Sequence, residues 1–305
     1  MELHQIRYFL AVARIGNFSR AARECHVSQP SLSQQIMKLE DELGEVLFHR
    51  QPQGTTLTDA GRLFAPHAER IAAEVEEAQR RVQESRGGVR GRFVLGVLPT
   101  IAPYLLPTLL EPFASDYPEV EVVVQEEITP HLLEGVQSGE IDVALLSLPV
   151  AGAGLERVEL FHEELLLVLP RSHPLARKKR VEMADLPKEK FILMQEGHCL
   201  SDQALEFCHA RGDFSPRVSC RSAQVETLLA LVKAGLGLSI IPEMAAKLGE
   251  GIAYRSLGPV PPRRKVGFVW RSHRFQPIAA AKFVERAVEL VGAQESGNRS
   301  PEGNE

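Results

Sequence analysis

Apolar residues at the start of the chain recur every three or four positions, which predicts a first helix over residues 6–13. A second helix is expected over 20–25, with Ser19 as its N-cap. After a tight turn, a third helix is expected over 30–43, with Ser28 as its N-cap and a proline in its first turn. Two short helices joined by a tight turn match the geometry of a helix-turn-helix.

The outward face of the third predicted helix carries amide, hydroxyl and ammonium groups that can meet base edges and phosphates. The segment that follows, residues 48–57, is expected to form a short hairpin wing. The candidate DNA-binding residues of helix and wing are Ser28, Gln29, Pro30, Ser31, Ser33, Gln34, Lys38, Arg50 and Thr56. Taken alone, this pattern fits a solvated amphipathic face equally well.

A long helix follows, because Thr58 can cap a helical pattern that continues to about Glu84. At 1.5 Å per residue, such a helix is nearly ~40 Å long. That is too long to serve a small head alone, so we expect it to pair with its copy in a dimer. Gly87-Gly88 and Gly91 mark a hinge, which makes residues 59–91 a linker helix and hinge.

Apolar strand patterns alternate with helical patterns over residues 92–291, which predicts an α/β domain with parallel sheets. Its size indicates two lobes with a ligand-binding cleft. The expected strands are 93–97, 120–124, 143–146, 165–169, 191–194, 238–241 and 265–270. A helix is expected over 277–291, and residues 292–305 are expected to be disordered.

Charge does little to identify the head as DNA-binding. The chain of 305 residues is 44% hydrophobic and has a formal net charge of −5. Its first 92 residues carry 13 Lys and Arg against 12 Asp and Glu, and all but one of the 13 are Arg. DNA binding is therefore argued from pattern, and Arg suits bidentate contacts to phosphate and guanine.

The cysteines are expected to be reduced thiols. Neither a secretory signal nor a membrane span is recognisable, so we expect a cytoplasmic protein. In that compartment Cys25, Cys199, Cys208 and Cys220 do not indicate a structural disulfide framework. Their spacing fits no zinc site, and no phosphate-loop or dinucleotide motif is present, so no metal or cofactor is expected.

Cys199 and Cys208 are nine residues apart. Ser201 is expected to cap a helix over 202–210, which would place Cys208 at least ~10 Å from Cys199. A disulfide needs the two Cα atoms within roughly 4.4–6.8 Å, so oxidation would have to melt or shift the helix. The segment would then be a two-state switch. The spacing leaves open a plainer alternative, which is one ordinary cysteine on a loop and one on a buried helix face.

The first 61 residues carry a dense and specific pattern: Phe9, Ser19, Ala21-Ala22, Val27–Ser33, Gln35-Ile36, Leu39-Glu40, Glu42–Gly44, Leu47-Phe48, Arg50 and Leu57–Gly61. This pattern resembles the DNA-binding head of the LysR-type transcriptional regulators, and the resemblance continues over essentially the whole chain. It implies a winged helix-turn-helix over 1–58 (all-α with a small β wing) and a dimerising linker helix. It also implies a two-lobed α/β effector domain like that of periplasmic binding proteins.

The resemblance to this family implies a gene regulator and not an enzyme. Members usually act as tetramers, so a dimer of dimers is expected. The implied partners are double-stranded DNA with a dyad operator and RNA polymerase.

The second half of the chain resembles the peroxide-sensing members of this family. The matching segments are Leu98–Thr100, Pro103–Pro107, Thr129, Met183–Leu186, Gly197–Leu200, Asp202–Ala204 and Phe207-Cys208. The resemblance implies that hydrogen peroxide oxidises Cys199, that Cys208 resolves the product, and that a disulfide reductase resets the bond. The residues that would line the peroxide pocket are Thr100, Thr129, His198 and Asp202. The two threonines could equally be helix caps.

The chain departs from this pattern at Ser201, where peroxide-sensing members usually carry a basic residue. An arginine there would help to hold the Cys199 thiolate. His198 and the nearby helix N-terminus would lower the pKa of Cys199, whereas Asp202 would raise it, and the sequence leaves that balance open.

Other functions fit parts of the sequence. A LysR-type regulator could bind an organic metabolite in the cleft while its cysteines stay silent. A thiol peroxidase would use both cysteines but would not need the DNA-binding head. A solute-binding protein for transport would need an export signal, and none is recognisable.

Overall fold

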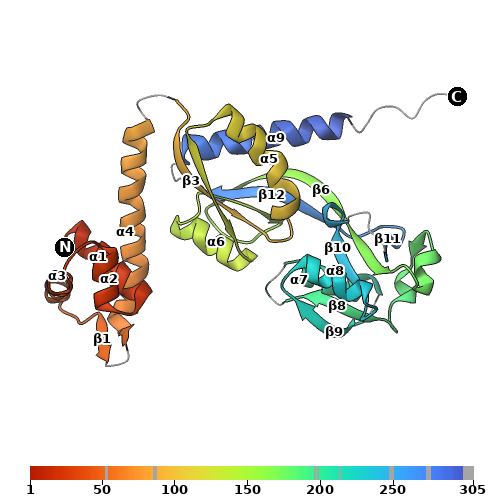
Figure 1. Cartoon of the computed structure of the whole chain (residues 1–305), viewed down its shortest axis with the longest axis horizontal. Helices are drawn as coiled ribbons and strands as arrows, with labels where there is room; N and C mark the ends of the chain where they lie inside the picture. The colour runs from red at the N-terminus through yellow and green to blue at the C-terminus, as the bar shows by residue number, and fades with distance from the viewer. Residues whose placement is uncertain are drawn as a thin grey trace. The chain divides into compact units, whose positions relative to one another are not determined.

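The computed structural model describes residues 1–51, 54–84, 88–195, 197, 199–212, 214–246, 251–272 and 276–297. Contacts between residues divide the chain into two compact units, of which the first is Met1–Gly87. The second unit takes almost all of the remaining chain. Figure 1 shows the helical first unit and the larger α/β second unit.

The first unit packs its helices around an apolar core, as the sequence predicts (Figure 1). The helices are α1 (Leu3–Ile15), α2 (Phe18–Glu24), α3 (Gln29–Leu43) and α4 (Asp59–Glu84). Phe9, Leu32 and Ile36 are fully buried at the centre. Leu32 and Ile36 are four residues apart and so lie on the same face of α3. That apolar face packs on the core, and the opposite face is left to solvent.

Side-chain caps set the boundaries of these helices. Asn17, and not the expected Ser19, caps α2, because its side-chain oxygen accepts a hydrogen bond from the Arg20 amide at 3.0 Å. The helix therefore begins two residues before its predicted start. Ser28 caps α3 as predicted, and Gly44 ends it in the left-handed region with φ 75°.

The predicted wing is a hairpin of β1 (Phe48–Gln51) and β2 (Gly54–Leu57). Thr58 then caps α4 as predicted, since its hydroxyl accepts from the Gly61 amide at 2.9 Å. It also donates to the Val46 carbonyl at 2.6 Å. The helix runs for 26 residues, about 39 Å at the standard rise.

The long strand β6 (Leu155–Pro170) runs through both lobes of the second unit, and β12 (Arg263–Arg271) pairs with its first half. The main sheet has the order β4-β3-β5-β12-β6-β11-β7, and β10 also pairs with β6. β3 is parallel to β4 and β5, whereas β12 is antiparallel to β5 and β6. The prediction of parallel sheets therefore holds for β3, β4 and β5 and is wrong for β12, which runs antiparallel to both of its neighbours in the sheet.

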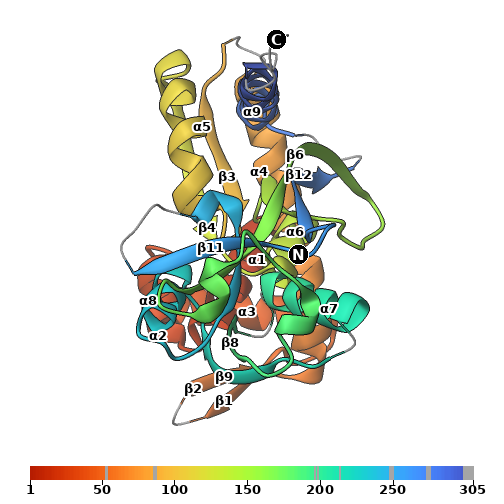
Figure 2. The ribbon, with the colours of Figure 1, turned by 90° about the vertical axis from the view of Figure 1, so that its right-hand side faces the viewer.

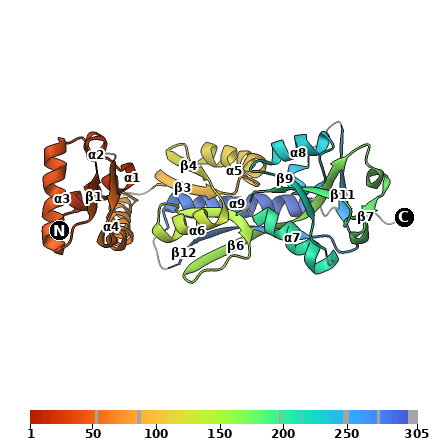
Figure 3. The ribbon, with the colours of Figure 1, turned by 90° about the horizontal axis from the view of Figure 1, so that it is seen from below.

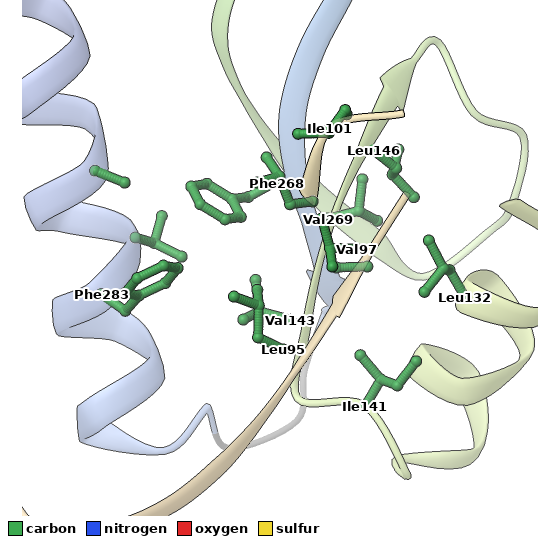
Figure 4. Close-up of a cluster of buried hydrophobic side chains, with 14 of the residues drawn as sticks. Leu95, Val97, Ile101, Leu132, Ile141, Val143, Leu146, Phe268, Val269 and Phe283 are labelled. Atoms are coloured by element: carbon green, nitrogen blue, oxygen red, sulfur yellow. The ribbon is translucent and has the colours of Figure 1, made fainter. Parts of the chain in front are cut away.

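Lobe 1 is built on the parallel part of the sheet. Besides the first portion of β6 and most of β12, it contains β3 (Gly91–Val97), β4 (Val120–Glu126), β5 (Val143–Leu148), α5 (Ala102–Asp116), α6 (Thr129–Ser138) and α9 (Ile278–Gly297). Figure 4 shows its core, with Phe283 of α9 on one side of the strands and Leu132 of α6 on the other. Leu95, Val143 and Phe268 between them are fully buried.

Lobe 2 has a separate core. Its strands and helices are β7 (Arg180–Val181), β8 (Lys190–Met194), β9 (Arg217–Ser222), β10 (Ser239–Pro242), β11 (Ile252–Leu257), α7 (Cys199–Gly212) and α8 (Val225–Lys233). Short 3-10 turns cover Pro174–Arg177, Met183–Asp185 and Glu243–Ala245. Figures 2 and 3 show α7 and α8 flanking the strands of this lobe.

Some boundaries differ from those predicted. β6 begins at Leu155 and not at 165, because pairing with β12 holds its polar first half in the sheet. α9 continues to Gly297, so residues 292–297 are helical where disorder was predicted. Residues 298–305 and the hinge residue Gly87 lie outside the described part of the chain. Among the described helices none is both long and apolar enough to cross a membrane.

Candidate functional site

Both cysteines of the predicted switch lie on one helix, α7, and both are free thiols. The helix begins at Cys199 and not at 202, so Ser201 lies inside it and the predicted cap is wrong. Nine residues of helix separate Cys199 from Cys208 by about 13 Å along the axis and by half a turn. A disulfide needs Cα atoms within roughly 6.8 Å. The intact helix therefore cannot carry the bond.

The two thiols also face different cores. Leu200, Ala204 and Cys208, spaced four residues apart, are buried in the core of lobe 2. Cys199 packs against the core of lobe 1. Bringing the sulfurs together would pull at least one of them out of its packing.

Ser201 ties the start of α7 to lobe 2. It is buried, and its hydroxyl accepts a hydrogen bond from Arg221 Nη1 at 3.4 Å. Arg221 lies on β9 and also donates to the Met194 carbonyl at the end of β8, again at 3.4 Å. A guanidinium thus lies next to the position where the peroxide-sensing pattern has a basic residue.

Several groups act on the Cys199 thiol. Burial is the largest influence and raises the pKa of Cys199 above its usual value, although the side chain keeps some exposure. The Arg264 charge, a hydrogen bond with the Thr129 hydroxyl and the Leu200 backbone amide oppose it, in that order. Asp202 raises the pKa further, which is the direction expected from the sequence.

Arg264 is held in a buried network beside this thiol. Its side chain is fully buried, and Nε donates to Glu163 Oε1 at 2.7 Å. Nη1 donates to the Thr100 hydroxyl at 2.9 Å and Nη2 to the Thr100 carbonyl at 3.1 Å. The other Glu163 oxygen accepts from the Met244 amide at 2.9 Å. Each group fixes the next, so the guanidinium has a defined position.

The structure describes three of the four predicted pocket residues. Thr100 and Thr129 lie in lobe 1, and Asp202 lies in the first turn of α7. Thr100 is 2% exposed and its hydroxyl accepts from Arg264 Nη1. It does not cap α5, because the N-cap of that helix is Ile101. Thr129 begins α6, and its buried hydroxyl oxygen has no nitrogen or oxygen partner among the described residues. Asp202 lies in the first turn of α7 and is exposed. His198 lies outside the described residues.

Sequence reasoning missed Arg264 and Glu163. Arg264 is the middle residue of three consecutive basic residues, Arg263 to Lys265, and the run itself does not indicate which side chain is buried. Strand alternation is the signal that was available. Side chains two residues apart on a strand point to the same face of the sheet. Arg264 therefore shares a face with buried Val266, and Glu163 shares a face with buried Leu165, so both charged side chains point inward from paired strands.

The remaining thiols differ in environment from Cys199. Cys208 is fully buried, and burial raises its pKa to about 11. It is therefore a neutral thiol at pH 7 while α7 is intact. Cys25 packs against the core of the first unit and Cys220 against the core of lobe 2.

The outward face of α3 matches the sequence prediction with one exception. Most of the candidate DNA-binding residues are exposed: Ser28, Gln29, Pro30, Ser31, Gln34, Lys38 and, on the wing, Thr56. Ser33 is only 9% exposed and turns toward the interior, because it lies next to Leu32 on the face that packs on the core. The side chain of Arg50 lies outside the described part of the structure, although its backbone belongs to β1.

Comparison with known protein families gives two matches that together cover most of the chain. Residues 3–62 match the bacterial regulatory helix-turn-helix of the lysR family. Residues 86–292 match the LysR substrate binding domain.

Individual relatives are similar over nearly their full length. The chain is 36% identical to the DNA-binding transcriptional dual regulator OxyR of Escherichia coli, covering 92% of this chain and 94% of that one. It is 35% identical to a probable hydrogen peroxide-inducible genes activator of Mycobacterium avium, covering 95% and 94%.

Solved structures agree with this. Full-length OxyR C199D from Pseudomonas aeruginosa superposes with a TM-score of 0.74 at 28% identity, covering 95% of this chain and 94% of that one. CbnR in complex with its target DNA gives a TM-score of 0.72 at 30% identity, with coverages of 95% and 100%.

Proposed function

The chain belongs to the LysR family of DNA-binding transcriptional regulators, and we propose that it senses hydrogen peroxide through a reversible disulfide between Cys199 and Cys208. The observation that carries the proposal is the placement of both thiols on α7, half a turn and about 13 Å apart. Oxidation then has to change the shape of the domain. Relatives named as peroxide-inducible activators support the choice of oxidant.

In the first step, the Cys199 thiolate attacks one peroxide oxygen and the O–O bond breaks. The sulfur becomes a sulfenic acid, and the departing hydroxide takes up a proton to form water. Arg264 and Thr129 stand beside the thiol and can donate hydrogen bonds to the peroxide oxygens. Thr100 keeps the guanidinium in place from the other side.

In the second step, the Cys208 sulfur attacks the sulfenic sulfur, the disulfide forms, and water leaves. The two thiols have then lost two electrons, and peroxide has become two molecules of water. Cys208 cannot react from its buried position, so α7 must unwind between the cysteines. A cellular dithiol reductant returns the pair to thiols by thiol–disulfide exchange.

Unwinding of α7 supplies the signal. Cys199 leaves the lobe 1 core and Cys208 the lobe 2 core, so the effector domains repack and the dimer or tetramer presents its DNA heads at a different spacing. On the DNA side, the proposed contacts are Ser28, Gln29, Pro30, Ser31, Gln34 and Lys38 of α3, with Arg50 and Thr56 of the wing. The operator is a dyad, and RNA polymerase is the downstream partner.

The test combines mass spectrometry with footprinting. A stoichiometric dose of peroxide is expected to convert the 199–208 pair to a disulfide and to change the footprint of the same sample. Cys199→Ser is expected to abolish both changes, and Cys208→Ser is expected to stop at the sulfenic acid. A full footprint response in Cys199→Ser would reject the proposal.

An organic effector remains the second candidate, because a cavity of about 360 Å³ adjoins α7. Pockets for small ligands start at roughly this size. The residues that line it include Leu148, Gln203, Phe207 and Arg263. A regulator of this kind would respond to a metabolite and ignore peroxide, and Cys199→Ser would respond like the unmodified protein.

A further inference from the structure

α7 is attached to lobe 1 by a polar contact as well as by Cys199. Gln203 Nε2 donates to Ser147 Oγ at 2.9 Å. Gln203 lies four residues after Cys199 and so points from the same face of the helix. Ser147 lies on β5, in the parallel part of the lobe 1 sheet, and is 4% exposed. This hydrogen bond therefore joins the switch helix to a rigid strand of the other lobe.

The contact is partly shielded from water. The hydrogen bond is part-buried, and Gln203 Oε1 is buried with no partner in the described part of the chain. Leaving this oxygen unpaired costs free energy, and the hydrogen bond from Nε2 to Ser147 offsets part of that cost.

We propose that Gln203 is a positioning residue, whose hydrogen bond to Ser147 holds α7 in its reduced shape and thereby sets the amount of peroxide that the switch requires. This inference rests on the proposed disulfide between Cys199 and Cys208.

The position of Gln203 in the chain makes loss of the bond a necessary part of the switch. It lies between the two cysteines, four residues after one and five before the other. The Cα atoms of the cysteines must approach from about 13 Å to within roughly 6.8 Å, and the residues between them must leave the helix for that to happen. Gln203 then moves away from β5, while Ser147 stays in the sheet.

The two chemical steps depend on this bond differently. Sulfenic acid forms at Cys199 with α7 intact, so the first step does not need the Gln203–Ser147 bond to break. Condensation with Cys208, which releases water and forms the disulfide, does. Removing the bond should therefore favour the oxidised state and leave the reaction with peroxide unchanged.

The decisive measurement is the redox equilibrium of the full-length protein in glutathione buffers. Gln203→Ala and Ser147→Ala should each increase the equilibrium constant for disulfide formation about tenfold, as loss of one part-buried hydrogen bond predicts. A tenfold change makes the midpoint potential of this two-electron couple about 30 mV more negative. Glu206→Gln changes an exposed side chain on the same helix and should leave the potential as in the unmodified protein.

A double-mutant cycle separates this role from general destabilisation. If the two side chains act through each other, Gln203→Ala/Ser147→Ala should shift the potential no further than either single variant. Additive shifts, or potentials equal to that of the unmodified protein, would overturn the inference. Should one single variant fail to fold, the other still tests the same bond from the opposite lobe.

The first step is measured separately in a Cys208→Ser background. There, Gln203→Ala should leave the rate of sulfenic acid formation within about twofold, while it speeds disulfide closure when Cys208 is present. A comparable change in both steps would place Gln203 in the peroxide site and reject the positioning role. If the unmodified protein forms no 199–208 disulfide, the proposed function itself fails. If it does and the variants titrate identically, only this inference fails.

Discussion

At the scale of single residues, the site is governed by competition between burial and charge. Burial raises the pKa of Cys199, and Arg264 is the largest of the groups that oppose it. Glu163 pairs with Arg264, so the guanidinium can stay inside the protein with its hydrogen bonds satisfied. The reactivity of the thiol therefore depends on residues that are far from it in the sequence.

The raised pKa of Cys199 predicts a steep dependence of oxidation on pH. The thiolate is the nucleophile, and below the pKa its fraction rises with pH. The rate constant for sulfenic acid formation should therefore increase about tenfold per pH unit between pH 6 and 8. Stopped-flow measurements on the Cys208→Ser protein would show this. A rate that levels off below pH 7 would mean that the opposing groups outweigh burial.

Removing the Arg264 charge should slow the reaction further. Arg264→Gln alone would leave Glu163 buried and unpaired, at a cost of roughly 3–5 kcal/mol. The informative variant is therefore Glu163→Gln/Arg264→Gln, in which the network stays neutral. Its rate of Cys199 oxidation at pH 7 should fall about tenfold, equivalent to one unit of pKa. Arg263→Gln, which changes the exposed neighbour, is the control and should react as the unmodified protein does.

At the scale of elements, the position of α4 depends on how closely its backbone approaches the backbone of the preceding loop at Leu47. The first turn of α4 passes the end of the α3–β1 loop so closely that a Cβ on Gly61 would stand 2.2 Å from the Leu47 carbonyl oxygen. Leu47 is itself fully buried, so its backbone has little room to give. Glycine at position 61 is thus a packing requirement of the head.

Gly61→Ala should destabilise the DNA-binding unit. The methyl group has to displace backbone, and overpacking of this kind costs typically about 1–3 kcal/mol. Gly292→Ala in α9 is the matched control, since its Cβ would meet nothing within 4 Å and alanine favours helix. Urea unfolding followed by circular dichroism should show a lower midpoint for the first variant only. Equal midpoints would mean that α4 and the Leu47 backbone move apart to accommodate the methyl group without loss of stability.

At the scale of the whole molecule, a chain with a net charge of −5 binds DNA through a local arrangement of groups. The head is almost neutral overall, and the exposed polar face of α3 presents Lys38 among amides and hydroxyls. Attraction to the phosphate backbone must then come from a few contacts, which limits how strongly the affinity depends on salt.

Lys38→Gln should weaken operator and non-operator DNA alike. Each lost phosphate contact lowers the slope of log affinity against log salt by about 0.9, so the slope should fall by roughly that amount for each head bound. Lys282→Gln is the control and should leave the slope unchanged, because Lys282 lies on the solvent-facing side of α9, paired with Glu285. Fluorescence anisotropy at several salt concentrations measures both. Loss of operator binding alone would instead assign Lys38 to base recognition.

Local patterns predicted much of the fold and part of the site. The wing, the Ser28 and Thr58 caps and the length of α4 follow from neighbouring residues, and so they could be predicted. The cap of α2 was misassigned because Asn17 and Ser19 are both good N-caps and only the course of the chain chooses between them. Ser33 was predicted on the outward face of α3 but is nearly buried. It lies at the edge of the face that packs on the core, where a rotation of the helix by a fraction of a turn decides whether a side chain is buried or exposed.

The sequence by itself determined the two-unit plan, the family and the pair of cysteines, because these depend on periodicity and on motifs of adjacent residues. Only the tertiary structure decided that α7 begins at Cys199, that Arg264 and Glu163 stand behind the thiol, and that Gln203 reaches Ser147 on the other lobe. Those contacts join positions up to 101 residues apart. No local pattern encodes such a distance, because it is the pairing of strands and the packing of lobes that bring the side chains together.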